Sequence, residues 1–144
     1  METNLRKVDL IFGEYSTEKY KILEKCVNMS SDDIINEILD SGLKGRGGAG
    51  FPTGLKWKYT KNQDADERFV VCNADEGEPG TFKDREILDK VPRKVFSGMA
   101  ICGKAIGAKK GFLYLRGEYT FLLPSLYKEL DIYNEHAKKF GLDF

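Results

Sequence analysis

Two short apolar segments alternate with helical segments in the second half of this chain, and this alternation limits the fold more than any other feature. Residues 69–72 (FVVC) read as a buried strand, and residues 112–116 (FLYLR) read as a second strand. Between them, residues 92–108 carry apolar side chains at helical spacing. Strands that are joined by a helix favour a parallel sheet with right-handed crossovers. We therefore predict an α/β fold, a parallel sheet with flanking helices.

Other helices are predicted on either side of these strands. Residues 16–29, 30–42 and 120–141 repeat apolar side chains at helical spacing, and Ser30 or Ser31 is a suitable N-cap. A further short strand is predicted around Val8–Phe12. Two clear strands and one short one make a thin sheet, because sheets average about 5–6 strands. We therefore expect this chain to form part of a larger domain.

Composition limits the class of protein. The 144 residues carry 23 basic and 23 acidic side chains, so there is no net charge to attract nucleic acid or an anionic membrane. The N-terminus does not resemble a signal peptide, and no apolar run approaches the ~20 residues that span a bilayer. The three cysteines Cys26, Cys72 and Cys102 lie far apart. We expect no disulfide framework, no metal site and a cytoplasmic protein.

Glycine occupies six of the thirteen positions from 42 to 54, so a loop must form there. Residues 45–50 match G-x-G-x-x-G, but a helix precedes them where the dinucleotide fingerprint requires a strand. Backbone N–H groups of such a loop can approach a flat or anionic ligand. Arg46 and Lys56 add positive charge, and Phe51, Trp57 and Tyr59 add aromatic rings. The alternative is a flexible surface loop with core-facing aromatic residues.

A second candidate loop follows the first strand. Asn73, Asp75, Glu76 and Glu78 are expected just beyond the carboxyl end of that strand, where α/β sheets bind ligands. Their oxygens can accept hydrogen bonds from ribose hydroxyls, and Asn73 can pair with the edge of a heterocycle. Two alternatives are an Mg²⁺ or Ca²⁺ site, although the ligand spacing of an EF-hand is absent, and a solvated charged turn.

Taken together, the two loops resemble one protein family. Segments 42–57 (GLKGRGGAGFPTGLKW) and 71–86 (VCNADEGEPGTFKDRE) are similar to the NADH-binding flavoprotein subunit of respiratory complex I. The same module occurs in NAD-linked hydrogenases and formate dehydrogenases. Segment 106–119 (IGAKKGFLYLRGEY) extends the likeness to about residues 30–144. The resemblance implies a truncated, partial Rossmann-like sheet, with an N-terminal segment and helix at 1–29 and the N-terminal portion of the FMN/NADH-binding domain at 30–144.

The resemblance also implies a role for individual residues. It implies hydride transfer from NADH to FMN, followed by single-electron transfer to iron–sulfur clusters. Glu76, between the two ligands, would be the catalytic residue. The residues implied to contact FMN are Gly45, Arg46, Gly47, Lys56, Asn73, Asp75 and Glu76. Those implied to face NADH are Phe51, Lys56, Tyr59, Glu76 and Glu78.

Several parts of the family pattern do not occur in this sequence. These are a second glycine–glutamate loop, the residues that hold the FMN phosphate, a ubiquitin-like domain and the cysteines of a [4Fe–4S] cluster. The resemblance therefore implies an incomplete NADH dehydrogenase-type subunit, at the cytoplasmic face where its complex is membrane-bound. Its partners would be the missing C-terminal half and a thioredoxin-like [2Fe–2S] subunit. The alternative is a non-catalytic structural component of a redox complex.

Overall fold

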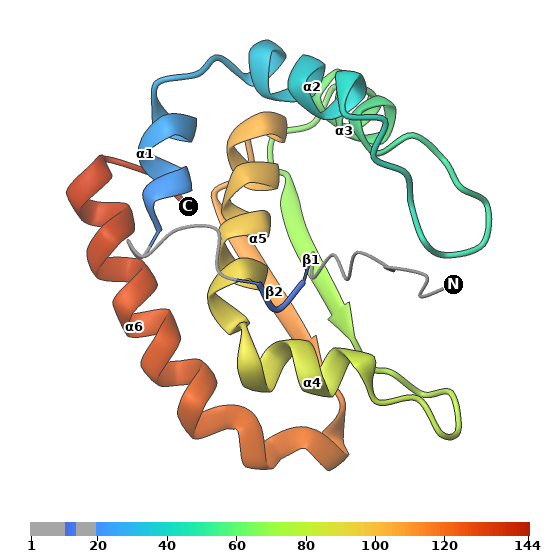
Figure 1. Ribbon diagram of the computed structural model, residues 1–144. Helices are drawn as coiled ribbons and strands as arrows, with labels where there is room; N and C mark the ends of the chain where they lie inside the picture. The colour runs from blue at the N-terminus through green and yellow to red at the C-terminus, as the bar shows by residue number, and fades with distance from the viewer. Residues whose placement is uncertain (1–10, 14–19) are drawn as a thin grey trace, which may run out of the picture.

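The computed structural model describes residues 11–13 and 20–144. Helices and strands are interspersed along the chain, and five helices and one strand precede the second strand (Figure 1). The elements are α1 (Lys21–Val27), α2 (Ser31–Asp40), α3 (Thr53–Lys61), β1 (Phe69–Ala74), α4 (Lys83–Lys90), α5 (Pro92–Ile106), β2 (Lys110–Leu115), the 3₁₀ helix η1 (Gly117–Leu122) and α6 (Leu123–Phe140).

The predicted α/β fold with a parallel sheet is confirmed. β1 and β2 pair in parallel from Phe69 opposite Lys110 to Ala74 opposite Leu115. The chain crosses between the strands through α4 and α5, and α5 lies along one face of the sheet (Figure 1). Because the strands are parallel, both carboxyl ends lie at the same edge of the sheet. This edge carries the acidic loop after β1 and the segment after β2.

The prediction that the first strand is buried is wrong for one of its faces. Only alternate residues of β1 face the core, and Val70 and Ala74 are the buried ones. Side chains on the other face are 43–62 % exposed, namely Phe69, Val71, Phe112 and Tyr114. An uninterrupted apolar run is typical of a strand covered on both faces. In the part of the chain that the structure describes, helices cover one face alone.

Helix α5 lies at the centre of the described structure. It contacts the five other α-helices and both strands. Ala100 and Ala105 on α5 are fully buried, and their small side chains let neighbouring elements approach closely. The main core joins α5 to α1, β1, α4 and α6 through Leu23, Ala74, Leu88, Phe96, Leu126 and Tyr133. Helix α1 therefore shares one core with the strands, while a domain division at residue 30 stays a prediction.

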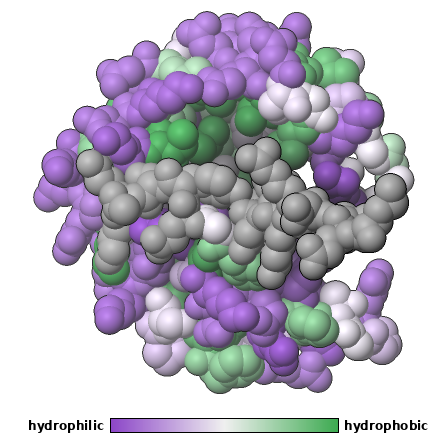
Figure 2. Space-filling view, viewed as in Figure 1, coloured by the Kyte–Doolittle hydropathy of each residue, from purple (hydrophilic) through white to green (hydrophobic). Residues whose placement is uncertain are grey.

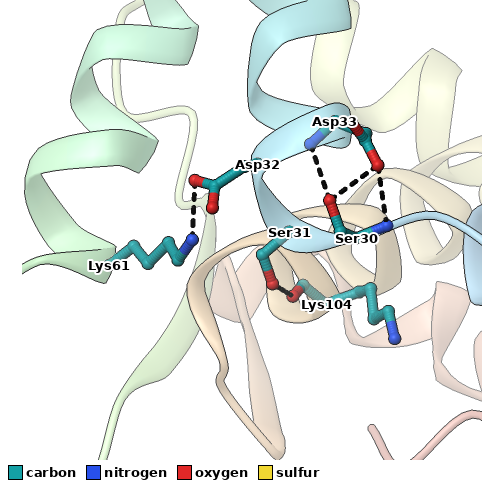
Figure 3. Close-up of polar contacts among 6 residues, drawn as sticks. All are labelled: Ser30, Ser31, Asp32, Asp33, Lys61 and Lys104. Carbon is teal, nitrogen blue, oxygen red and sulfur yellow. Dashed lines mark hydrogen bonds and ion pairs between the residues drawn. The ribbon is translucent and has the colours of Figure 1, made fainter.

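Helix α2 begins at the serine pair that the sequence marked as its N-cap (Figure 3). The Asp33 N–H donates to Ser30 Oγ at 3.1 Å, and the Asp33 carboxylate accepts the Ser30 hydroxyl at 2.6 Å. Ser31 Oγ donates to the Lys104 carbonyl of α5 at 3.0 Å. Lys61 at the end of α3 pairs with Asp32 at 2.7 Å. These contacts hold the start of α2 between α3 and α5.

An apolar depression of about 150 Å³ lies between α1, α2 and α5. Its lining includes Ile22, Met29, Ile34 and Ile101. In Figure 2, apolar side chains gather in a hollow below the polar upper rim of the molecule. None of the helices among the described residues is long and apolar enough to cross a membrane. The strand predicted around Val8–Phe12 falls mostly outside the described residues.

Close packing of α2 against α3 yields a first prediction. A Cβ atom added at Gly54 would lie 2.6 Å from Leu39 Cγ and 3.0 Å from the Ile35 carbonyl oxygen. We expect Gly54→Ala to lower the free energy of unfolding by about 1–3 kcal/mol through overpacking. Urea denaturation measures the change. In the control Gly98→Ala, on the exposed side of α5, a Cβ meets nothing within 4 Å. That variant should gain about 0.5–1 kcal/mol, and equal effects would contradict the packing.

Candidate functional site

The acidic loop starts at the carboxyl end of β1, as predicted, but one of its residues belongs to the strand. β1 extends to Ala74, so Asn73 is its penultimate residue and not a loop residue. The Asn73 side-chain oxygen accepts the Asp75 N–H at 3.1 Å. The Arg116 N–H donates to the Ala74 carbonyl at 3.1 Å. Backbone pairing with β2 therefore continues as far as the start of the acidic loop.

Glu76 is held by contacts from two other parts of the chain. Its φ of +40° is left-handed, which is uncommon for a residue other than glycine. Glu76 Oε1 accepts the Asp84 N–H at 2.7 Å, and Oε2 accepts the Arg85 N–H at 3.3 Å. Helix α4 has no cap from its own N-cap side chain. Glu76 therefore caps α4 from eight residues upstream.

Tyr119 also binds this carboxylate. Its hydroxyl donates to Glu76 Oε2 at 3.0 Å. Desolvation favours a higher pKa for Glu76, but the hydrogen bonds from α4 and Tyr119 outweigh it and hold the pKa below its usual range. Desolvation and the same hydrogen bond raise the pKa of Tyr119. The contact therefore favours an ionised Glu76 beside a neutral phenol at neutral pH.

Arg116 anchors the acidic loop from the segment after β2. Its guanidinium donates to the Glu76 carbonyl and to the Glu118 carboxylate. Neither Arg116 nor Tyr119 was assigned to the site from the sequence. The available signal was their place after the second strand, because parallel strands end at the same edge of a sheet.

The remaining acidic residues of the loop face solvent. Asp75 and Glu78 are exposed, as is Asn73 on the strand. Carboxylate oxygens in this position can accept hydrogen bonds from hydroxyl groups of a ligand. The Asp75 and Glu78 carboxylates are therefore accessible to a ligand, as their predicted role requires. The Glu76 carboxylate, in contrast, already accepts hydrogen bonds from three donors in the chain.

The glycine loop is a hairpin-like connection between α2 and α3. Lys44 and Pro52 form an isolated antiparallel bridge, and the Gly45 N–H donates to the Phe51 carbonyl at 2.8 Å. Gly48 and Gly50 have φ values of +96° and +60°, which other residues adopt at a cost. No atom lies within 4 Å of a Cβ added at Gly47, so the space beside it is open. The loop thus has a closed base and an open tip.

Side chains around the glycine loop divide into two groups. The Phe51 and Tyr59 rings lie 6.4 Å apart and are both largely exposed. The cationic residues Arg46 and Lys56 are exposed as well. Trp57 instead packs against apolar core residues. The alternative of a core-facing aromatic residue therefore applies to Trp57 but not to Phe51 or Tyr59.

The two loops do not touch each other. Within residues 11–13 and 20–144, no hydrogen bond or ion pair joins the glycine loop to the acidic loop. Figure 1 shows both loops extending on the same side of the molecule, the acidic loop past the carboxyl end of β1 and the glycine loop well apart from it, beside the other half of the strand. A ligand that contacts both must therefore be long enough to reach from one to the other.

Two of the cysteines have surroundings that disfavour reactivity. Burial raises the pKa of the Cys102 thiol to about 11 and also raises that of Cys72. A raised pKa disfavours the reactive thiolate. Among the described residues, no group of three or more His, Cys, Asp or Glu side chains is placed to hold a metal ion.

Comparison with known proteins points to one family. A model of the Nuo51 FMN-binding domain matches residues 38–140. The NAD-reducing hydrogenase HoxS subunit alpha of Cupriavidus necator is 47% identical over 130 residues, which are 90% of this chain and 22% of that protein. An NADH-quinone oxidoreductase subunit of Aquifex aeolicus is 49% identical over 122 residues, 85% of this chain and 28% of that protein.

A solved structure has the same fold. It is a crystal structure of an NAD⁺-reducing [NiFe]-hydrogenase in the H₂-reduced state, 42% identical, with a TM-score of 0.81 over 89% of this chain and 22% of that chain. The present chain spans less than three tenths of the length of each of these relatives.

The contacts of Glu76 generate a second prediction. Glu76→Ala should destabilise the chain by about 0.5–2 kcal/mol, because α4 loses its cap. Glu78→Ala is the control, since Glu78 is exposed and its side chain forms no hydrogen bond in the described structure. The pKa of Glu76 is depressed on folding, so its contribution is complete at pH 7. It should disappear as pH falls through the folded pKa, which lies below the usual value for a glutamate.

Denaturation of both variants at a series of pH values from 7 downward measures the effect. A difference between them that does not diminish as Glu76 becomes protonated would show that the charge of Glu76 does not cap α4.

Proposed function

Because this chain belongs to the family of Nuo51 FMN-binding domains, we propose that it supplies FMN- and NADH-contacting loops of an NADH-oxidising flavoprotein. The match over residues 38–140 carries the proposal, because this range contains both the glycine loop and the acidic loop. The proposed class is an oxidoreductase subunit. Bound FMN supplies the chemistry, since a flavin accepts a hydride and passes electrons on singly to iron–sulfur clusters.

The residues present fit a flavin mononucleotide in their donor chemistry. The open space beside Gly47 leaves room for a flat ring, and the loop offers backbone N–H groups at its edge. Exposed Arg46 and Lys56 provide cations for an anionic group. At the carboxyl end of β1, exposed Asn73 and Asp75 provide polar groups that can bind hydroxyls. Gly45 and Glu76 complete the set that we propose for FMN.

NADH is proposed to bind beside the same loops. Phe51 and Tyr59 are exposed rings that can stack on a nicotinamide or an adenine, and Lys56 can attract a phosphate. The exposed carboxylate of Glu78 can accept hydrogen bonds from a ribose. Glu76 is proposed to lie between the two ligands, with its charge fixed by α4 and Tyr119. It holds no proton to donate at neutral pH, because its pKa is lowered.

We propose that the chain works in assembly with other subunits. Both relatives described above are named as subunits of larger enzymes, which supports this. The partners proposed here are the remaining part of the flavoprotein and a thioredoxin-like [2Fe–2S] subunit, with any [4Fe–4S] cluster held outside these 144 residues. The exposed apolar face of the sheet, with Val71 and Phe112, offers a surface for such a contact.

A third prediction concerns the 144 residues by themselves. We expect them to bind FMN with a dissociation constant in the micromolar range or weaker. The proposed ligand-binding side chains are exposed on two loops that do not touch, so a ligand stays largely hydrated. Quenching of FMN fluorescence on titration measures the affinity. Purified protein with one tightly bound FMN per chain would show instead that the two loops form a complete pocket.

The fourth prediction tests the glycine loop. In the assembled protein, Gly47→Ala should remove most bound FMN and NADH:ferricyanide activity while the fold stays intact. No protein atom obstructs the added methyl group, so a loss must come from the space that the ligand uses. Gly98→Ala is the matched control on α5, and we expect it to retain flavin and activity. Full activity of Gly47→Ala would mean that the loop is a connector between helices.

A further inference from the structure

The acidic loop is fixed in place by two side chains that lie about forty residues further along the chain. Arg116 donates to the Glu76 carbonyl, and Tyr119 donates to the Glu76 carboxylate at 3.0 Å. Arg116 follows β2 directly and Tyr119 lies in η1, where the Tyr119 N–H closes a turn on the Arg116 carbonyl at 2.9 Å. One rigid turn therefore contacts both the backbone and the side chain of a single residue.

The conformation of Glu76 requires such support. A left-handed backbone costs about 1–3 kcal/mol at a residue other than glycine, and it persists where surrounding contacts fix it. Glu76 has contacts from α4 on one side and from the turn after β2 on the other. The turn supplies the hydrogen bonds that do not depend on the local helix. Loss of Arg116 or Tyr119 therefore frees the loop on the side of β2.

The ligand-facing residues depend on this conformation. Asp75 and Glu78 lie one residue before and two residues after Glu76, and both are exposed. A change in the backbone dihedral angles of Glu76 rotates these two carboxylates relative to each other. Their relative direction, and hence the hydroxyl groups that they can reach together, is set at Glu76.

We propose that Arg116 and Tyr119 are positioning residues, which bind Glu76 and so set the direction in which the acidic loop presents Glu78 to the nicotinamide nucleotide and Asp75 to the neighbouring flavin. The identity of the ligand in this inference rests on the proposed function. The contacts of Arg116 and Tyr119 with Glu76 do not depend on that function. Arg116 and Tyr119 touch neither the glycine loop nor its cations in the described structure. Their role is exerted through Glu76.

A first experiment examines the contact on the 144-residue chain. Tyr119→Phe removes one hydroxyl, and Tyr127→Phe is the control because Tyr127 is exposed on α6 and its hydroxyl forms no hydrogen bond with described residues. Carboxyl NMR titration should show the pKa of Glu76 rising in Tyr119→Phe, since a donor to the charged form is lost. The other groups that lower the pKa of Glu76, the Lys83 charge and the two backbone N–H groups of α4, remain in both variants. An unchanged pKa would overturn the inference at its first step.

A second experiment measures the consequence in the assembled protein. Tyr119→Phe and Arg116→Lys should each raise KM for NADH about 5–20-fold with a smaller change in kcat, as expected when binding geometry is lost. In Tyr119→Phe, the acid limb of the kcat/KM profile should move to higher pH together with the pKa of Glu76. Tyr127→Phe should leave both unchanged. Loss of thermal stability alone does not produce this pattern.

The outcomes separate this inference from the proposed function. A shifted pKa with an unchanged KM in Tyr119→Phe would refute the positioning role and leave the proposed function intact. An unmodified assembly that neither binds FMN nor oxidises NADH would refute the proposed function, while the titration still reports the contact with Glu76.

Discussion

Close packing around α5 is the constraint on which the described structure depends. This helix contacts both strands and the five other α-helices. Fully buried Ala100 and Ala105 allow that, because larger side chains would hold the neighbouring elements apart. Gly103 has the same role, since an added Cβ would lie 2.3 Å from the Phe144 ring. The centre of the molecule thus consists of small residues that permit contact in several directions.

The crossover through α5 also creates the acidic side of the candidate site. By returning the chain parallel to β1, it places the end of β2 beside the end of β1. Arg116 and Tyr119 then meet Glu76, which in turn caps α4. One residue therefore joins three segments that are separate in sequence. Its left-handed backbone is maintained by contacts that exist only in the folded chain.

The glycine loop is supported in a different way. Its base is closed by its own backbone, and the two helices that carry it are fixed by Gly54 packing and by contacts of Ser31 and Asp32. The tip contacts nothing on the acidic loop among the described residues. A rigid base with an open tip fits a loop whose remaining contacts come from a ligand or from a partner.

The sequence alone determined the α/β class, the parallel order, the N-cap of α2 within the pair Ser30 and Ser31, and the positions of the two loops. These features depend on local periodicity, capping and glycine content, which can be read from neighbouring residues. The resemblance of the two loop motifs to one family was confirmed by the match over 38–140. The roles given to individual residues toward FMN and NADH stay predictions.

Only the tertiary structure decided that one face of each strand is exposed, that Trp57 packs into the core, and that Arg116 and Tyr119 bind Glu76. An apolar run does not reveal how many of its faces are covered. Residues about forty positions apart cannot be paired from local pattern, because their contact exists only once α5 has brought β2 alongside β1.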